Sequence, residues 1–269
     1  MRLTGEQIRR FEEEGYLFLP SVFSADEIAV LTGEVPGIFA QERPEVIREK
    51  GSNAPRSAFF VQTWNEAFGL LARHPRLLRP VTTLLGSERL YMHQFKINAK
   101  AAFDGAVWQW HQDYATWHAD DDMPEPKAMN IALFLAEVNE FNGPLMFIPA
   151  SHRGGRLAAG HDLTTTSYPL WTIDNETITK LVERGGIVAP KGPAGSMLMF
   201  HGNLVHASGS NLTPWSRWIV YLSLNRCDNG IRRHRRANWI ANRDFTPIAM
   251  APDDCLITYA RTHRRPAAE

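Results

Sequence analysis

The chain has 269 residues, 44% of them hydrophobic, with 29 basic and 29 acidic side chains. This length suits one all-β domain, since such folds often run to about 200–250 residues as a unit. The zero net charge disfavours nucleic acid and anionic membranes as partners. The two cysteines, Cys227 and Cys255, are too few for a disulfide framework, so a metal would have to be bound by His, Asp or Glu.

No targeting segment is evident at the start of the chain. The first residues lack the basic and apolar regions of a signal peptide, and no uncharged apolar run approaches the length of a membrane span. We therefore expect a cytoplasmic protein, monomeric or homodimeric, with neither a membrane nor a nucleic-acid partner.

Helices are predicted in the first third of the chain. Capping-box patterns, in which Ser or Thr is followed three residues later by Glu or Gln, predict helices that begin after Thr4 and after Ser24. A short strand is expected between them at 16–19. A third helical pattern runs from about 65 to 85 and must break or bend near Pro75, because proline removes a backbone donor. These helices are expected to support a sheet.

Strands dominate the prediction from about residue 89 onwards. Short apolar runs separated by Gly, Pro, Asn and Asp are typical of a sandwich or barrel; they lie at 90–97, 128–135, 144–148, 196–200 and 218–224. A helical part at about 1–88 followed by a strand-rich part at about 89–250 predicts one domain, 1–269. Its expected fold is an all-β core with flanking helices, a double-stranded β-helix (jelly roll, cupin-like). The polar segment 41–57 is expected to lie on the surface, where it could cover a site.

Two His-x-Asp sequences are candidates for a metal site. Residues two apart on a strand point the same way, so His111 and Asp113 can face one cavity. His118 and Asp120 have the same spacing, but they lead into a charge run that is typical of a solvated loop, whereas His111 lies among aromatic residues. From these residues alone, little separates the two pairs.

A third ligand is expected from a distant strand. His201 and His206 follow the apolar run 196–200, and their separation of five allows only one of them to face the site on a regular strand. The residues after His206 favour it: Ser208 can bond an acidic co-substrate, and Arg217 can bind a carboxylate through two parallel hydrogen bonds. The alternative for Arg217 is a surface ion pair. Two imidazoles and one carboxylate suit a non-heme ferrous centre that activates oxygen.

These residues together resemble the phytanoyl-CoA dioxygenase superfamily of iron(II)- and 2-oxoglutarate-dependent oxygenases. Within it, the chain is most similar to the branch that hydroxylates ectoine and free amino acids such as leucine and pipecolate. The likeness is carried by the runs 93–98, 110–113, 141–145, 149–152 and 206–208, together with Arg217. Ala150 and Ala207 depart from it, since the family more often has glycine at both positions.

The resemblance implies roles for particular residues. It implies iron ligation by His111, Asp113 and His206. It implies a 2-oxoglutarate pocket made by Arg217, Ser208, Asn98, Asn130 and Trp108. It also implies substrate contacts from Gln94, Trp117 and Arg243, and Arg56, in the segment 41–57, is a further candidate substrate contact. The basic run 232–236 is interpreted instead as a solvated loop, which is the usual role of a short charge run.

The implied reaction is hydroxylation of an unactivated C–H bond. The resemblance implies Fe(II), 2-oxoglutarate and O2 as cofactor and co-substrates, release of succinate and CO2, and a small free amino acid or cyclic imino acid as substrate. Two alternatives remain at this point. One is a substrate attached to coenzyme A or a carrier protein, and the other is a jelly-roll binding module without catalysis.

Overall fold

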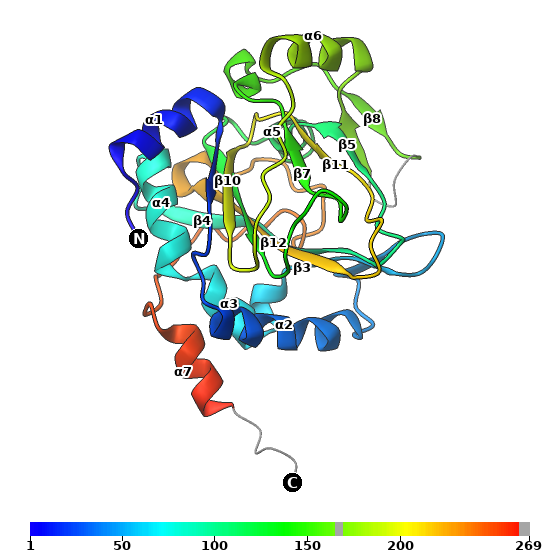
Figure 1. Cartoon of the computed structure of the whole chain (residues 1–269). Coiled ribbons are helices and arrows are strands. Elements are labelled where there is room, and N and C mark those ends of the chain that lie inside the picture. The colour runs from blue at the N-terminus through cyan, green and yellow to red at the C-terminus, as the bar shows by residue number, and fades with distance from the viewer. Residues whose placement is uncertain (165–168, 264–269) are drawn as a thin grey trace.

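A computed structural model describes residues 1–164 and 169–263 as two antiparallel sheets with flanking helices (Figure 1). The larger sheet has the order β1-β10-β6-β12-β4-β3-β2, and the smaller has the order β7-β11-β5-β9-β8. The strands are β1 (Tyr16–Leu19), β2 (Val46–Arg48), β3 (Pro55–Phe59), β4 (Leu90–Lys100), β5 (Trp108–His111), β6 (Ala128–Phe134), β7 (Leu145–Phe147), β8 (Gly160–Asp162), β9 (Leu170–Thr172), β10 (Met197–His201), β11 (His206–Ser208) and β12 (Arg217–Arg226). The two sheets form a jelly roll, which confirms the predicted fold class.

The two faces of the larger sheet differ in what covers them. Its outer face packs against the helices of the main hydrophobic core, and its inner face lines the jelly roll. On β12, for example, Val220 and Leu222 belong to the outer core while Ile219 and Tyr221 point inward. The helices are α1 (Gly5–Glu14), α2 (Ala25–Phe39), α3 (Glu66–Ala72), α4 (Pro75–Leu85), α5 (Asp113–Asp121), α6 (Asn175–Gly185) and α7 (Cys255–Thr262).

The N-terminal elements follow the sequence prediction except in one segment. Both capping boxes are formed, at Thr4 and Ser24, and the third helical pattern is divided into α3 and α4, with Pro75 in the first turn of α4. The segment 41–57 is not an entirely irregular surface stretch. It contains β2 and most of β3, which extend the larger sheet beyond β4. The prolines and glycine in this stretch concealed the two short strands.

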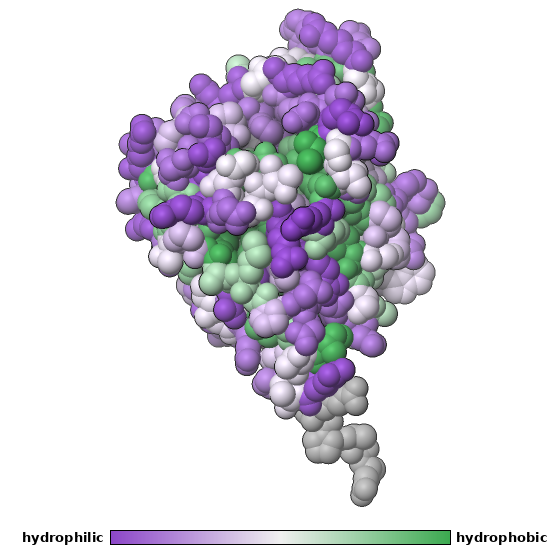
Figure 2. Space-filling model, turned by 90° about the vertical axis from the view of Figure 1, so that its left-hand side faces the viewer, coloured by the Kyte–Doolittle hydropathy of each residue, from purple (hydrophilic) through white to green (hydrophobic). Residues whose placement is uncertain are grey.

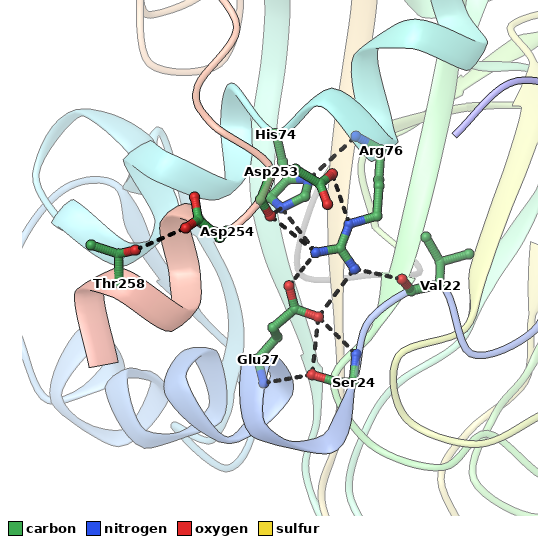
Figure 3. Close-up of polar contacts among 8 residues, drawn as sticks. All are labelled: Val22, Ser24, Glu27, His74, Arg76, Asp253, Asp254 and Thr258. Atoms are coloured by element: carbon green, nitrogen blue, oxygen red, sulfur yellow. Dashed lines mark hydrogen bonds and ion pairs between the residues drawn. The ribbon is translucent and has the colours of Figure 1, made fainter. Parts of the chain in front are cut away.

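A polar network fixes the C-terminal segment to the helices (Figure 3). The guanidinium of Arg76 on α4 forms an ion pair with the carboxylate of Glu27 on α2. Its Nε lies 3.2 Å from Oδ1 of Asp253, just before α7. The ring of His74 lies 3.0 Å from the backbone carbonyl of Asp253. Three elements distant in the sequence are therefore held at one point, and residues 227–254 are anchored at their far end.

The molecular surface shown in Figure 2 is mostly polar, with apolar residues exposed in small groups between polar ones. None of the helices in the part of the chain that the structure describes is both long and apolar enough to cross a membrane. This finding agrees with the absence of a hydrophobic span from the sequence.

The two alanines that replace family glycines differ in backbone conformation. Ala150 has φ of +63°, in the left-handed region that favours glycine, and its N–H donates to the carbonyl of Glu14. Ala207 lies within β11, where an extended backbone suits any residue. The departure from the family pattern therefore carries a conformational cost at Ala150 and none at Ala207.

We predict that Ala150→Gly stabilises the protein. Relief of the left-handed alanine should raise the free energy of unfolding by about 1 kcal/mol, measured by denaturant unfolding. Ala207→Gly is the matched control, and it should lower stability by about 0.5–1 kcal/mol, because glycine weakens a strand interior. A loss of stability in Ala150→Gly would contradict the prediction.

Candidate metal centre and co-substrate cavity

Two histidines and one aspartate meet at the inner side of the smaller sheet. His111 ends β5, His206 begins β11, and the two residues are direct partners across these strands, which lie side by side in Figure 1. Asp113 is the first residue of α5, and its carboxylate oxygens lie 3.6 Å from Nε2 of His111 and 3.5 Å from Nε2 of His206. One ligand atom from each of the three residues lies within 4.8 Å of the others, so a single ion can contact all three.

The chain between the first two ligands differs from the expected regular strand. β5 ends at His111, and Gln112 is an extended residue that precedes the first turn of α5. The side chain of Gln112 points away and bonds the backbone of Gly155, Leu157 and Asn203. The two ligands still share one side, but a strand end and a helix start achieve this. The positive end of the helix dipole also favours a carboxylate at Asp113.

Backbone carbonyls orient both imidazoles. Nδ1 of His111 lies 2.6 Å from the carbonyl of Gln109, and Nδ1 of His206 lies 2.9 Å from that of Leu204. A carbonyl only accepts hydrogen bonds, so each Nδ1 carries the proton and donates it. Each Nε2 lone pair is then turned toward the Asp113 carboxylate, which is the arrangement usual for metal-binding histidines.

The aspartate is held in its charged form by its neighbours. Burial alone would raise the pKa of Asp113, but His206, His111 and Lys96 outweigh this effect and lower it. Asn130 on β6 donates a hydrogen bond of 2.7 Å to the same carboxylate. The carboxylate is therefore ionised at neutral pH and oriented by Asn130.

His206 is kept neutral. Burial and the neighbouring His111 lower the pKa of His206 to about 4, although Asp113 opposes them. The orientation of Asn130 is also fixed, because its side-chain oxygen accepts a bond of 2.6 Å from Ser223 on β12. A charged carboxylate and neutral imidazoles are the protonation states that bind a divalent ion.

A cavity opens beside this triad, between the two sheets. Nine of the residues singled out in the sequence line it: Gln94, Asn98, Trp108, His111, Asp113, Trp117, Asn130, His206 and Ser208. The lining also includes residues to which the sequence assigned no role in the site, namely Lys96, Thr116, Leu145, Leu170, Ala207, Tyr221 and Arg236. Alternation along β4 could have identified Lys96, since it lies between Gln94 and Asn98 on the same face of the strand.

Arg217 is buried at the end of the jelly roll that also contains Ser208. It is 2% exposed, and it donates to the carbonyls of Asn142 (3.1 Å) and Gly143 (2.6 Å). This burial excludes the alternative of a surface ion pair. Burial lowers its pKa, and the hydroxyl of Tyr221 is the group that opposes this shift. A buried guanidinium whose recorded contacts are with neutral groups is costly unless a bound anion completes its surroundings.

Lys96 brings a second positive charge to the cavity. Its ammonium lies over the rings of Trp108 and Tyr221, at 5.5 and 5.7 Å from their centres. Burial, opposed by Asp113 and reinforced by Arg236 and Arg56, lowers the pKa of Lys96 to about 8. The ammonium is therefore largely charged at neutral pH and available to an acidic ligand.

Two arginines implied as substrate contacts lie outside the cavity lining. Arg243 is exposed, and its guanidinium donates to the backbone carbonyls of His234 and Arg236. Arg56 is 1% exposed and lies behind Trp108, with its guanidinium carbon 4.2 Å from the ring centre and Nη1 2.7 Å from Glu49. The structure thus brings neither guanidinium to the cavity wall.

The basic run 232–236 is only partly the solvated loop that its composition predicts. Arg232, His234 and Arg235 are exposed, whereas Arg236 turns inward and lines the cavity. Arg236 also forms an ion pair with Asp121, the last residue of α5. A pattern of charge along the chain cannot show which of several arginines turns inward, because that depends on the path of the loop.

Comparison with known proteins agrees with this geometry. Residues 11–219 match the family model described as phytanoyl-CoA dioxygenase (PhyH). The chain belongs to the phytanoyl-CoA dioxygenase family. It is a 2-oxoglutarate-dependent non-heme iron dioxygenase, which removes the alternative of a binding module without catalysis.

Two named relatives and one crystal structure match between 84% and 93% of this chain. The "Ectoine dioxygenase" of Bordetella bronchiseptica is 38% identical over 239 residues, which are 84% of this chain and 77% of that protein. The "L-proline trans-4-hydroxylase" of Streptomyces griseoviridis is 34% identical over 257 residues, 92% of this chain and 96% of that protein. The crystal structure of EctD from S. alaskensis with 2-oxoglutarate and 5-hydroxyectoine has a TM-score of 0.82 at 32% identity, covering 93% of this chain and 87% of that one.

We predict that His111→Ala and His206→Ala each abolish stoichiometric Fe(II) binding, because each removes one of three protein ligands. Anaerobic titration with Fe(II), followed by the visible band that forms on adding 2-oxoglutarate, measures this. Asn130→Ala should weaken iron binding by about tenfold to a hundredfold, because Asn130 orients the carboxylate.

The matched control is His118→Ala, which belongs to the rival His-x-Asp pair. Its Nδ1 lies 3.1 Å from the carbonyl of Met123. Its loss should leave the iron affinity unchanged, and loss of iron from His118→Ala but not from His111→Ala would contradict the assignment.

Proposed function

We propose that this dioxygenase hydroxylates an unactivated C–H bond of a small free amino acid or cyclic imino acid. The substrate, 2-oxoglutarate and O2 would be converted to the hydroxylated product, succinate and CO2. The observation that carries the proposal is a cavity beside the triad with the cations Lys96 and Arg236 in its lining, which suits small acids. The relatives described above support this substrate class, because their names give ectoine and L-proline as substrates.

His111, Asp113 and His206 are the residues that would hold iron. Their donor set, two imidazoles and one carboxylate, fits ferrous iron in this family of oxygenases. Iron supplies the activation of oxygen when bound, and the surrounding chain supplies position and exclusion of water.

Arg217 and Ser208 are the proposed partners of the distal carboxylate of 2-oxoglutarate. Ser208 pairs with Leu145 across β11 and β7, and Arg217 donates to Gly143, two residues before Leu145. Both side chains are therefore at one end of the jelly roll, and both are buried. Ser208 lines the cavity together with Asn98 and Lys96 on β4, which add a donor and a positive charge, whereas Arg217 is not part of that lining and touches it through Tyr221. A dicarboxylate fits this set better than a neutral ligand does.

Gln94, Trp117 and Arg236 are the proposed substrate contacts. Trp117 lies on α5, one turn after Asp113, so its ring supplies an apolar wall near the metal ligands. The amide of Gln94 is held by a hydrogen bond of 2.9 Å to the carbonyl of Ile240, in the C-terminal segment. Arg236 supplies the positive charge for a substrate carboxylate. We assign this role to Arg236 rather than to Arg243, because only Arg236 lines the cavity.

A substrate screen tests the proposed function. Free amino and imino acids, both linear and cyclic, should be assayed with Fe(II), 2-oxoglutarate and O2. The expected result is a mass gain of one oxygen in at least one of them, with stoichiometric succinate. Failure of every free acid, together with turnover of the corresponding coenzyme A or carrier-protein esters, would overturn the proposal.

The proposed contact between Arg217 and the distal carboxylate of 2-oxoglutarate is tested by Arg217→Gln. This change should raise the KM for 2-oxoglutarate by about tenfold to a hundredfold, as expected for loss of a charge-assisted pair, while the substrate KM changes less. Arg226→Gln is the control on the same strand, because Arg226 pairs with Asp228 at the exposed end of β12. An unchanged 2-oxoglutarate KM in Arg217→Gln would exclude this assignment.

The two candidate substrate arginines are separated by a pair of variants. Arg236→Gln should raise the KM for the amino acid about tenfold or more, with the 2-oxoglutarate KM near that of the parent. Arg243→Gln, seven residues later, should change the substrate KM much less, through loss of its hydrogen bond to the Arg236 carbonyl alone, and should leave the 2-oxoglutarate KM unchanged. The reverse pattern would assign the carboxylate to Arg243.

A further inference from the structure

One buried carboxylate beside the cavity has no role in the proposed chemistry so far. Asp121 is 0% exposed and ends α5, the helix that begins with Asp113. Its two carboxylate oxygens bind one edge of the Arg236 guanidinium, with Nε 2.8 Å from Oδ1 and Nη2 in contact with Oδ2. This two-point contact fixes the plane of the guanidinium as well as its position.

The placement of Asp121 is unfavourable on local grounds. A carboxylate at the C-terminal end of a helix is repelled by the negative end of the helix dipole. Burial adds a desolvation cost, which an ion pair does not always recover. A neutral residue would avoid both costs, and such local conflicts concentrate at functional sites.

The surroundings tie Asp121 to a second wall of the cavity. Its Oδ2 lies 3.5 Å from Nε2 of His93, which is fully buried, and the His93 ring packs edge-on against Trp117, with centroids 5.3 Å apart. The backbone carbonyl of Asp121 accepts hydrogen bonds from the N–H groups of Arg232 and Arg233. The end of α5 thus holds both the loop that carries Arg236 and a residue that supports Trp117.

The helix connects this anchor rigidly to the metal ligand. Asp113 and Asp121 are eight residues apart on α5, a rise of about 12 Å along a regular helix. We propose that Asp121 is a positioning residue that fixes Arg236 relative to the metal ligands, and so sets which C–H bond of the substrate is presented for oxidation. This inference rests on the proposed function, in which Arg236 binds the substrate carboxylate.

Asp121→Asn tests the inference in the iron-loaded enzyme, with an acid that the parent hydroxylates. The variant keeps the size of the side chain and removes its charge. We expect the KM for that acid to rise about tenfold or more, the 2-oxoglutarate KM to stay within twofold, and more succinate to form per hydroxylated product. Asp121→Glu, which shifts Arg236 by one methylene, should change the ratio of hydroxylated regioisomers. Asp122→Asn, at the next position, is the control.

A coupled pair of substitutions separates positioning from structural support. If Asp121 acts through Arg236, adding Asp121→Asn to Arg236→Gln should cause no further rise in substrate KM. Thermal unfolding shows whether Asp121→Asn folds. If it does not, Arg236→Lys replaces it, because lysine keeps a positive charge beside Asp121 but cannot form the two-point contact. Arg236→Lys is then expected to show the same rise in KM and loss of coupling.

Two results would overturn the inference. The first is that Asp121→Asn keeps both the substrate KM and the ratio of succinate to product within twofold of the parent values. If Arg236→Lys has replaced that variant, the same result in Arg236→Lys counts. The other is a full additive effect in the double variant. The proposed function is judged separately, on turnover by the parent enzyme, so its failure and that of the positioning role are distinguishable.

Discussion

The pairing of β5 with β11 is the constraint on which the site depends. This ladder sets His111 directly opposite His206, so two imidazoles that are 95 positions apart in the chain become neighbours on one face of the smaller sheet. Their Nδ1 protons are committed to backbone carbonyls, which leaves little rotational freedom to either ring. Asp113 completes the set because the chain turns from strand to helix one residue after His111. A slip of one residue in this ladder would turn one imidazole to the other face of the sheet.

Much of this arrangement could be predicted from the sequence because it depends on local patterns. Capping boxes, strand alternation and the distributed family motifs lie within short stretches, and they identified the N-terminal helices, the β core and the metal triad, but not α5 or α7. The two strands in 41–57 were missed, since their stability comes from pairing with β4 rather than from their own composition. The position of Arg236 was missed for a similar reason. Its inward turn is set by contacts with α5, more than 100 positions earlier in the chain, and no local pattern records them.

Positive charge is concentrated at the end of the jelly roll that contains Arg217. Arg56, Lys100 and Arg217 are each at most 2% exposed, and of these four cations Lys96 is the one in the cavity lining. Burial lowers the pKa of Lys100, and repulsion from Arg217 and Arg56 lowers it further. Glu49 offsets part of this charge through Arg56. If 2-oxoglutarate binds at this end, as proposed, its two carboxylates would relieve this repulsion, and binding of the co-substrate would stabilise the fold.

The polar network around Arg76, called here the tether, affects how relatives with this fold can differ in substrate. Residues 227–254 run from the end of β12 to Asp253, where the tether fixes them, and they carry Arg236 and the carbonyl that holds Gln94. No named strand of either sheet lies within this span. Insertions or substitutions there can reshape the substrate side of the cavity while the strands that hold the metal ligands remain unchanged. In the proposed function, part of the choice of substrate is therefore encoded in a segment that carries no metal ligand, while Gln94 and Trp117 contribute from β4 and α5. Selection can alter that segment and leave the metal-binding strands as they are.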